Sequence, residues 1–434
     1  MIIEQIAFVL IAGGAAFIAF RAFYKIYRNI MLGKKESIPG NLKAMFFVAL
    51  GQQKMFKRPI AAVLHLVIYV SFVITQIELI EIGIDGLFGV HRAIFHWWEN
   101  IPVLKSFYTF IISFIEVLSF LTFFVTIAFL WRRNLLKLPR FNKPEMKGWA
   151  TNDANIILFM EIILLSNIFL MNIADMAYAD GKYGFWLSGM ISPYFESWNK
   201  DLLHIYFKIG WWGHLFAVLG FLVYLSYSKH LHILLAFPNT YFSKETPKGY
   251  IANMPEVTKE VKLMLDPNAA VDSSADTAPA KFGAKDVFDL SWKNLLDAYT
   301  CTECGRCTAQ CPANLTRKLL SPRKIMMDTR DRLEEVGKAM DANGGVWKED
   351  GKSLIDNGYI SVEELRACTT CNACVEECPV NISPLDIIVQ LRRSLIMEDS
   401  NSPAEWNGMF SNLENNGAPW QFSQQDRLNW AKEG

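Results

Sequence analysis

All eight cysteines of the chain lie in two short runs that share one spacing. Residues 301–312 and residues 368–379 both read C-x2-C-x2-C-x3-C-P. Three thiolates at this spacing can bind one [4Fe–4S] cluster, while the fourth points away and binds the cluster of the other run. The spacing therefore predicts two clusters with crossed fourth ligands. The expected ligands are Cys301, Cys304, Cys307 and Cys378 for the first cluster, and Cys368, Cys371, Cys374 and Cys311 for the second.

Two other uses of these cysteines are less favoured. A C-x2-C pair also binds zinc, but a tetrahedral zinc site needs neither a third cysteine at the same spacing nor a terminal Cys-Pro. A disulfide framework is disfavoured because all the cysteines sit in two tight runs. Thiolates that hold clusters require a reducing compartment, so we expect the C-terminal half in the cytoplasm.

The elements that must position these residues divide into an apolar half and a soluble half. Hydrophobic residues are 52% of the 434-residue chain and concentrate before residue 240, whereas every cysteine follows residue 300. Five apolar stretches are long enough to cross a bilayer, near 3–24, 59–84, 106–131, 154–178 and 206–236. We predict an all-α protein with a five-helix transmembrane bundle at 1–240, a linker at 241–284 and a helical two-cluster domain at 285–434.

Basic residues cluster in two connections between these stretches. They are Lys25, Arg28, Lys34, Lys35, Lys43, Lys54, Lys57 and Arg58 in one connection, and Arg132, Arg133, Lys137, Arg140, Lys143 and Lys147 in the other. The alternate connections, 85–105 and 179–205, carry few. The positive-inside rule then places the N-terminus outside and the two-cluster domain in the cytoplasm, at a bacterial inner membrane, which agrees with the cysteine argument.

Three histidines of the apolar half suggest haem ligands. His214 and His232 are eighteen positions apart in the fifth stretch. On one continuous helix this is five turns, so both rings would share a face roughly 27 Å apart along the axis. His65, near the cytoplasmic end of the second stretch, and His232 are the expected ligands of an inner b-type haem.

The ligation of a second, outer haem is open. His214 has no obvious partner in the second stretch, where Gln76 lies at the matching depth. His91 or His96, in the outer connection, is the candidate second ligand; alternatively the bundle holds a single haem. We interpret His204 and His230 as ordinary interfacial or hydrogen-bonded histidines.

Three carboxyl groups fall inside or near the ends of the predicted spans. Charged groups in a bilayer are costly and are often functional. We therefore regard Glu78, Glu116 and Glu161 as candidate quinone contacts or proton relays, with snorkelling toward the boundary as the alternative.

Residues 1–240 resemble the cytochrome b subunit of respiratory nitrate reductases and related subunits of membrane-bound heterodisulfide reductases. The resemblance rests on span order, orientation, His65 and the His214/His232 spacing. It implies a cytochrome b bundle that exchanges electrons with quinone near an outer haem. The chain departs from the nitrate reductase type because the second stretch has one histidine only, which affects the outer haem.

The soluble half contains several helix-start signals. Ser321-Pro322 and Ser383-Pro384 each place a capping residue before a proline at the first helical position, and Ser361 with Glu364 forms a capping box. Residues 266–281 are small, polar and proline-punctuated, which is typical of a connector.

Residues 285–434 resemble the N-terminal iron–sulfur module of heterodisulfide reductase-type and anaerobic glycerol-3-phosphate dehydrogenase-type proteins. The matching segments are 295–307, 311–314, the second cysteine run and 416–420. The resemblance implies a ferredoxin-like fold and a separate partner subunit with cysteine-rich CCG domains. The aromatic tail could dock that partner or pack on its own module; its residues are Trp406, Trp420, Phe422 and Trp430.

These features together predict an electron-transfer subunit between membrane quinone and a cytoplasmic partner, through haem b and two [4Fe–4S] clusters. By resemblance, the partner system acts on a disulfide, a 2-hydroxy acid, glycerol 3-phosphate or reduced electron-transfer flavoprotein. Alternatives are a redox-sensing membrane protein and a scaffold with vestigial cofactors. The sequence has no recognisable kinase, DNA-binding element, nucleophile constellation or dinucleotide fingerprint, so we expect no nucleic-acid partner and no substrate chemistry in this chain itself.

Overall fold

The computed structural model describes residues 2–136, 138–179, 183–244, 246–247, 249–266, 281–421 and 423–432. These residues form helices and no β-strand. The expected connector at 266–281 lies almost wholly outside the described residues, as do Lys137 and Phe422.

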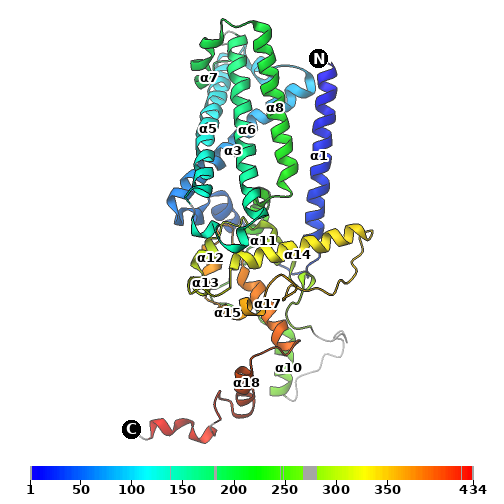
Figure 1. The fold of residues 1–434 in the computed structure, drawn as a ribbon, viewed down its shortest axis with the longest axis vertical. Helices are drawn as coiled ribbons and strands as arrows, with labels where there is room; N and C mark the ends of the chain where they lie inside the picture. The colour runs from blue at the N-terminus through cyan, green and yellow to red at the C-terminus, as the bar shows by residue number, and fades with distance from the viewer. Residues whose placement is uncertain are drawn as a thin grey trace.

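Five long apolar helices run side by side and form the upper part of the molecule (Figure 1). They are α1 (Ile2–Ile30), α3 (Pro59–Phe88), α5 (Pro102–Asn134), α6 (Trp149–Tyr178) and α8 (Lys200–Leu225). Each is long and apolar enough to cross a membrane. The first four contain the predicted stretches and extend beyond them. The packing of α6 on α8 is close: a Cβ added at Gly210 would lie 2.6 Å from the Met171 backbone nitrogen.

The fifth predicted stretch is wrong in its C-terminal part. Helix α8 ends at Leu225, a short turn η6 covers Lys229–Leu231, and a new helix α9 (His232–Tyr241) begins at His232. The chain breaks because polar groups take up the backbone hydrogens here: Ser228 caps His230 N, and Asp153 accepts from Lys229 N at 3.2 Å. The argument that His214 and His232 share one face of a continuous helix therefore fails.

Short helical segments connect the long helices. They are α2 (Leu42–Ala44), η1 (Met45–Leu50), η2 (Gln53–Lys57), α4 (Ala93–Trp98), η3 (Pro139–Phe141), η4 (Pro144–Met146), α7 (Trp186–Ile191) and η5 (Ser192–Phe195), with α10 (Pro255–Leu265) following α9. The segments η1, η2, η3 and η4 lie at the end of the bundle that faces the soluble module; α4, α7 and η5 lie at the other end.

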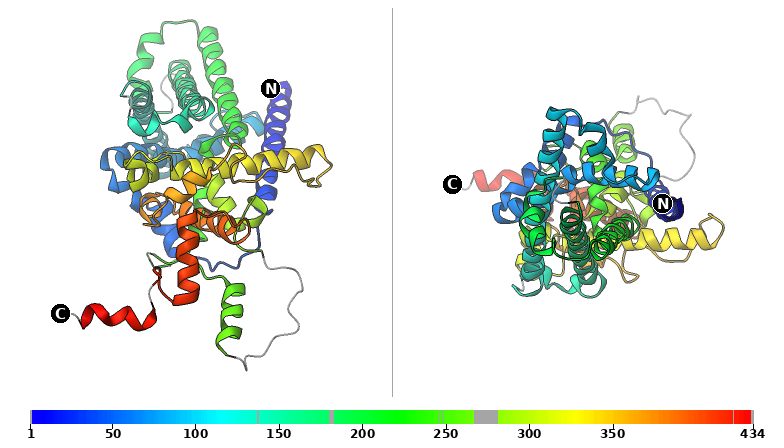
Figure 2. Two further views of the ribbon diagram at one scale, coloured as in Figure 1. Left: turned by 60° about the horizontal axis from the view of Figure 1, so that its bottom comes forward. Right: turned by 90° about the horizontal axis from the view of Figure 1, so that it is seen from above.

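The soluble module lies against that end of the bundle (Figures 1 and 2). Its elements are η7 (Val287–Asp289), α11 (Trp292–Thr300), α12 (Arg306–Gln310), α13 (Pro312–Leu315), α14 (Pro322–Ala342), α15 (Val362–Ala367), α16 (Ala373–Glu377), α17 (Pro384–Met397), α18 (Ala404–Asn416) and η8 (Gln424–Ala431). The three predicted helix starts are confirmed: Ser321, Ser361 and Ser383 each cap the helix that follows.

Helix α1 continues past the bundle and packs on the module. Ile26 and Ile30 belong to the same buried core as Leu295 and Leu333. Asn29, also buried, donates to the Tyr299 hydroxyl at 3.0 Å. This extension explains why α1 is longer than the predicted stretch, since its last turns are buried by protein.

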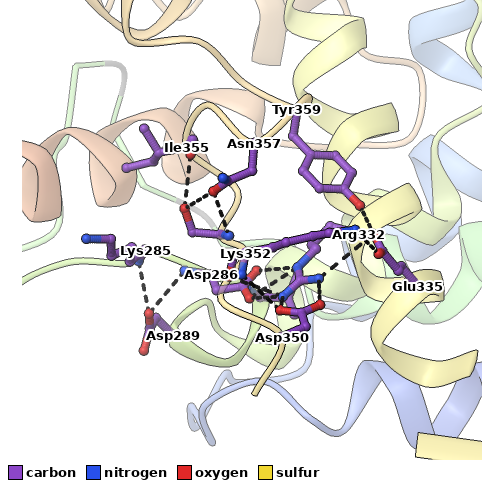
Figure 3. A network of polar contacts seen from close by, with 12 residues as sticks. Lys285, Asp286, Asp289, Arg332, Glu335, Asp350, Lys352, Ile355, Asn357 and Tyr359 are labelled. Atoms are coloured by element: carbon purple, nitrogen blue, oxygen red, sulfur yellow. Dashed lines mark hydrogen bonds and ion pairs between the residues drawn. The ribbon is translucent and has the colours of Figure 1, made fainter. Parts of the chain in front are cut away.

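A buried arginine fixes the long insertion between the two cysteine runs. Arg332 of α14 is 0% exposed and donates to Asp286 at 2.7 Å and to Asp350 at 2.6 Å (Figure 3). The same network includes Glu335, which accepts from the Tyr359 hydroxyl. Charge-assisted bidentate pairs of this kind are stronger than neutral hydrogen bonds, so the insertion is held on α14 and the two runs keep a fixed separation.

The C-terminal segments extend away from the rest of the chain (Figure 1). Helix α18 has no buried residue, and Trp406, Trp420 and Trp430 are all exposed. Trp406 still contacts its own module, because the Arg366 guanidinium of α15 lies 6.0 Å from its ring centroid, so both uses of the aromatic tail stay predictions.

Candidate cofactor sites

The first cysteine set lines one cavity. Cys301, Cys304 and Cys307 surround it together with Cys378 from the other run, and Cys374 also reaches its wall. Arg323 and Met326 of α14 are also part of the lining. The four thiols that the spacing assigned to one cluster are thus brought together by the fold.

The second cysteine set lines a neighbouring cavity, and it too combines three cysteines of one run with one of the other. Cys368, Cys371 and Cys374 are joined there by Cys311 of the first run. Leu320, Leu385 and Ile388 provide apolar walls.

The two runs share one backbone geometry. Glu303 and Thr370 occupy equivalent positions at φ 52° and 53°, and Gly305 and Asn372 follow at φ 70° and 61°. Left-handed conformations are costly for residues other than glycine and persist where the surroundings demand them. Here they fold each C-x2-C-x2-C segment around its cavity and start the short helix that carries the third cysteine.

The buried thiols fit a positively charged iron core. Burial raises the pKa of Cys301 to about 12 and that of Cys378 to about 11, with neighbouring thiols adding to the effect. Such thiols stay protonated in an empty cavity, whereas a coordinating metal deprotonates them outright. Backbone hydrogens already point at sulfur, from Ile382 to Cys378 at 3.3 Å and from Thr370 to Cys368 at 3.4 Å. No three His, Cys, Asp or Glu side chains in the described ranges form a single-ion site.

A histidine site lies at the end of the bundle next to the first cavity. His65 on α3 donates its Nδ1 hydrogen to Gln52 Oε1 at 3.0 Å, and His232 donates its own to the Lys229 carbonyl at 3.0 Å. A partner on Nδ1 fixes the tautomer and leaves Nε2 for iron, as metal-binding histidines require. Both imidazoles are therefore held in the tautomer that binding to a metal through Nε2 requires.

His230 belongs to the same site, which the sequence analysis missed. Its ring centroid is 5.5 Å from that of His232, and its Nδ1 is buried without a hydrogen-bond partner. Burial lowers the pKa of His230 well below its usual value, and nearby His232, Lys229 and His65 lower it further. The signal for His230 was the H-x-H pair, which we discounted because we expected a continuous helix.

A buried ion pair joins the histidine segment to the first cysteine run. Lys229 Nζ lies 2.5 Å from Glu303 Oε2 and donates to the Ala150 carbonyl at 2.6 Å. Arg330 of α14 binds the other oxygen of Glu303 at 2.8 Å. Lys229 immediately precedes His230, and Glu303 lies between Cys301 and Cys304, so the contact holds the two candidate cofactor sites side by side.

The turn η2 makes a second connection between these sites. Gln52, its N-cap, binds His65, while Arg306 of the first run donates to the carbonyls of Lys54 at 3.2 Å and Met55 at 3.4 Å. Lys57 then pairs with Glu376 of α16 at 2.7 Å. The turn η2 and its N-cap thus contact His65 and both cysteine runs.

A polar cluster occupies the opposite end of the bundle. Arg92 is 2% exposed, and its guanidinium lies 3.1 Å from Glu78, 3.3 Å from Glu81 and 3.6 Å from Asp175. Asp85 accepts the backbone hydrogens of residues 92 and 93 at 2.8 and 2.9 Å. Three buried carboxyl groups thus surround one guanidinium and a fourth binds the adjacent backbone, and burying a net negative charge is strongly unfavourable unless protons neutralise part of it.

The three histidines considered for an outer haem lie in different environments. His91 donates through Nε2 to Asp175 at 2.9 Å, which occupies the nitrogen that haem ligation would use, so its ligation stays a prediction that requires this pair to open. His96 pairs with Glu99, and His214 is buried with Nδ1 on the Leu164 carbonyl at 3.3 Å.

The remaining candidate carboxyl groups and His204 lie elsewhere. Glu116 accepts from the backbone of Leu187 at 2.7 Å and of Ser188 at 3.0 Å, a structural role at the start of α7. Glu161 is half-buried on α6. His204 is exposed, in line with its ordinary interpretation.

Comparison with known proteins agrees with the cysteine chemistry. Residues 293–379 match the 4Fe–4S dicluster domain. The chain is 27% identical to "Probable iron-sulfur-binding oxidoreductase FadF" of Bacillus subtilis, over 93% of this chain and 57% of that protein. It is 26% identical to "EtfAB:quinone oxidoreductase" of Syntrophomonas wolfei, over 94% of this chain and 55% of that protein.

A third relative shares a shorter region. "Probable membrane-anchored ferredoxin" of Chromohalobacter salexigens is 34% identical over 36% of this chain and 25% of its own length. Subunits D and C of Methanosarcina heterodisulfide reductases also match parts of the chain. The chain spans about half the length of the first two relatives. None of the solved structures matches it significantly.

Glu145, in the connection between α5 and α6, gives a test of how the module is docked. Its Oε1 accepts from Arg323 and from Ser321, each at 2.7 Å, and Arg323 is 0% exposed. Glu145→Ala leaves a buried guanidinium unpaired, so we expect a loss of about 3–5 kcal/mol in thermal unfolding of the purified chain. The matched control is Glu376→Ala, which breaks an exposed pair worth about 0–1 kcal/mol.

The same contact predicts a pH dependence. Burial raises the pKa of Glu145, but hydrogen bonds from Ser321 and Arg323 outweigh it and hold the pKa below its ordinary value. A carboxyl group with a depressed folded-state pKa stabilises fully above its unfolded pKa of about 4.3, and the contribution is lost as pH falls through the folded value. Equal losses for both alanine variants, or no acid sensitivity in the wild type, would contradict this account of docking.

Proposed function

We propose that this protein is the membrane electron-transfer subunit of a quinone-linked oxidoreductase. Electrons pass between quinone in the membrane and a cytoplasmic redox partner through haem b and two [4Fe–4S] clusters. The observation that carries the proposal is the buried Lys229–Glu303 pair, which joins the segment bearing His230 and His232 to the segment bearing Cys301 and Cys304. Cofactors held on these two segments lie next to each other across the boundary between bundle and module.

The partner is proposed from the relatives and from exposure. One relative is named as an EtfAB:quinone oxidoreductase, and others are heterodisulfide reductase subunits. We therefore favour reduced electron-transfer flavoprotein as the redox partner. The alternative partner is a CCG-domain subunit that connects this chain to it. Cys371 is exposed, whereas Cys301 of the other set is buried, so the second cluster is the one that the partner approaches.

The orientation follows from the same arrangement. The basic connections contact the module: Lys57 pairs with Glu376 and Arg58 with Glu377. The positive-inside rule then places the module in the cytoplasm and the Arg92 cluster toward the outer surface of the inner membrane.

A haem between α3 and the η6–α9 segment is the central element of the proposal. His65 and His232 are the residues that would hold it, with His230 as the alternative to His232. The haem supplies one-electron chemistry when bound. The protein's part is to hold the two rings, which Gln52 and the Lys229 carbonyl do through Nδ1.

The direct test is quinol-dependent reduction of haem in the purified full chain. Adding a short-chain quinol to the wild type should give a reduced b-type haem spectrum. His65→Ala should abolish haem binding, and His230→Ala compared with His232→Ala identifies the second ligand. His204→Ala, an exposed histidine of α8, is the matched control and should retain full haem content. Full haem in all three ligand variants, or a wild-type haem that quinol never reduces, would refute the proposal.

The crossed cluster ligation is tested by pairs of substitutions. Cys304→Ala and Cys378→Ala remove ligands of the same proposed cluster, so the double variant should keep about four irons per chain, as each single variant does. Cys304→Ala with Cys311→Ala should remove both clusters and leave almost no iron. Iron and sulfide analysis measures this, and ligation within each run predicts the reverse result for the two pairs.

The Arg92 cluster is the proposed site of quinone proton exchange. Quinone reduction consumes two protons for two electrons, and a buried cluster with four carboxyl groups and one guanidinium can store and deliver protons. Glu78 is the candidate proton carrier because it lies 3.1 Å from Arg92 and points into the bundle from α3.

Glu78→Gln keeps the shape of the side chain and removes its acid–base capacity. We expect it to slow quinol-dependent haem reduction by about 10²–10⁴-fold, the usual contribution of a positioned acid–base group, with haem content unchanged. Glu99→Gln, in the outer connection, serves as the control. Stopped-flow absorbance measures the rate, and an unchanged rate in Glu78→Gln would place proton exchange elsewhere.

A further inference from the structure

Arg140 is half-buried next to the first cysteine cavity, and part of its guanidinium is buried without a hydrogen-bond partner. It lies in η3, in the connection between α5 and α6, and its carbonyl accepts from Arg323 Nη1 at 2.7 Å. Arg323 lines the cavity. The guanidinium stacks on Phe141 at 4.9 Å, and its Nε and Nη1 atoms are buried without a hydrogen-bond partner.

The groups around Arg140 do not neutralise it. The pKa of Arg140 is lowered to about 10, mainly by burial and also by Arg132, Arg58 and Arg306, while Cys304 acts in the opposite direction. Glu145, the nearest acid in sequence, pairs with Arg323 instead. Leaving a charge buried and unpaired is strongly unfavourable. An anion next to the Nε and Nη1 atoms would therefore stabilise the guanidinium.

A cluster in the first cavity would be that anion. A [4Fe–4S] core with four thiolate ligands carries net negative charge, which increases by one when the cluster accepts an electron. A fixed positive charge nearby therefore stabilises the reduced form more than the oxidised form and raises the reduction potential.

The second cavity has a different electrostatic environment. Arg392 is the cation next to Cys368, and its hydrogens are already used by the carbonyls of Leu365 at 2.7 Å and Cys368 at 2.5 Å. Cys371 is exposed, so solvent also screens the charge there.

We propose that Arg140, reaching from the membrane half, is the charge partner of the cluster held by Cys301, Cys304, Cys307 and Cys378 and makes it the higher-potential cluster of the two. This inference rests on the proposed cluster assignment and adds the direction in which electron transfer between the two clusters is favourable. Electrons that arrive at the exposed second cluster move favourably to the first, beside the histidine site. It also makes Arg140 a positioning residue, because the cluster's charge then helps to hold the bundle connection against the module.

The test is a redox titration of both clusters by electron paramagnetic resonance in the purified full chain. Arg140→Gln should shift the potential of the higher-potential cluster downward and leave the other unchanged; a shift of the lower-potential cluster alone would contradict the inference. Arg140→Lys keeps the charge and should shift the higher potential less. The matched control is Arg317→Gln, an exposed arginine that follows the first run, which should leave both potentials unchanged.

Each outcome decides the inference. A selective downward shift of the higher-potential cluster in Arg140→Gln supports it, and so does loss of about four irons in Arg140→Gln with retention in Arg140→Lys. Unchanged potentials at full iron content overturn it, as does loss of all iron in both variants, which would mean a role in folding. Since the titration uses neither quinol nor haem, wild-type protein without iron refutes the proposed function, whereas iron without a shift refutes this inference alone.

Discussion

The arrangement depends on one buried contact, the ion pair between Lys229 and Glu303. Both side chains are almost fully buried, and each has further partners: Asp153 and the Ala150 carbonyl for Lys229, and Arg330 for Glu303. Removing one member of such a pair leaves an uncompensated charge and is strongly destabilising, whereas a satisfied network fixes a unique geometry. The pair joins the segment that follows the last bundle helix, with its two histidines, to the first cysteine run.

Charge is separated between the two ends of the bundle. At the module end, arginines from the bundle and the module gather around Cys304, and the proposed cluster supplies the balancing negative charge. At the other end, Arg92 is outnumbered by buried carboxyl groups, and bound protons supply the balance. In a low-dielectric bundle, the excess positive charge at one end and the excess negative charge at the other are both unfavourable until a group of opposite charge is bound. The proposed function assigns electron transfer to the module end and proton exchange to the other end.

Sequence reasoning worked where the signal was local. The capping serines at 321, 361 and 383 each begin the helix they predicted, because a cap depends only on residues within one turn. The four thiols expected for each cluster line a common cavity, because the spacing itself encodes the crossing. The prediction of the fifth span was wrong at its C-terminal end. Hydropathy predicted that the span continues through 226–236, but the helix ends at Leu225, where Asp153 binds the Lys229 backbone. Asp153 lies more than seventy residues away, so no local pattern could reveal the break.

The sequence by itself determined the iron–sulfur cluster type, the helical class and the division into apolar and cluster-bearing halves, since each follows from residue spacing and composition. Only the tertiary structure decided that His230 joins His65 and His232, that three buried carboxyl groups surround Arg92, and that part of the Arg140 guanidinium lacks a hydrogen-bond partner. The physical reason is that the environment of each of these residues depends on charged and polar groups from segments far away in the sequence. Whether a buried charge is paired depends on which helices pack against it, and the fold alone specifies that packing.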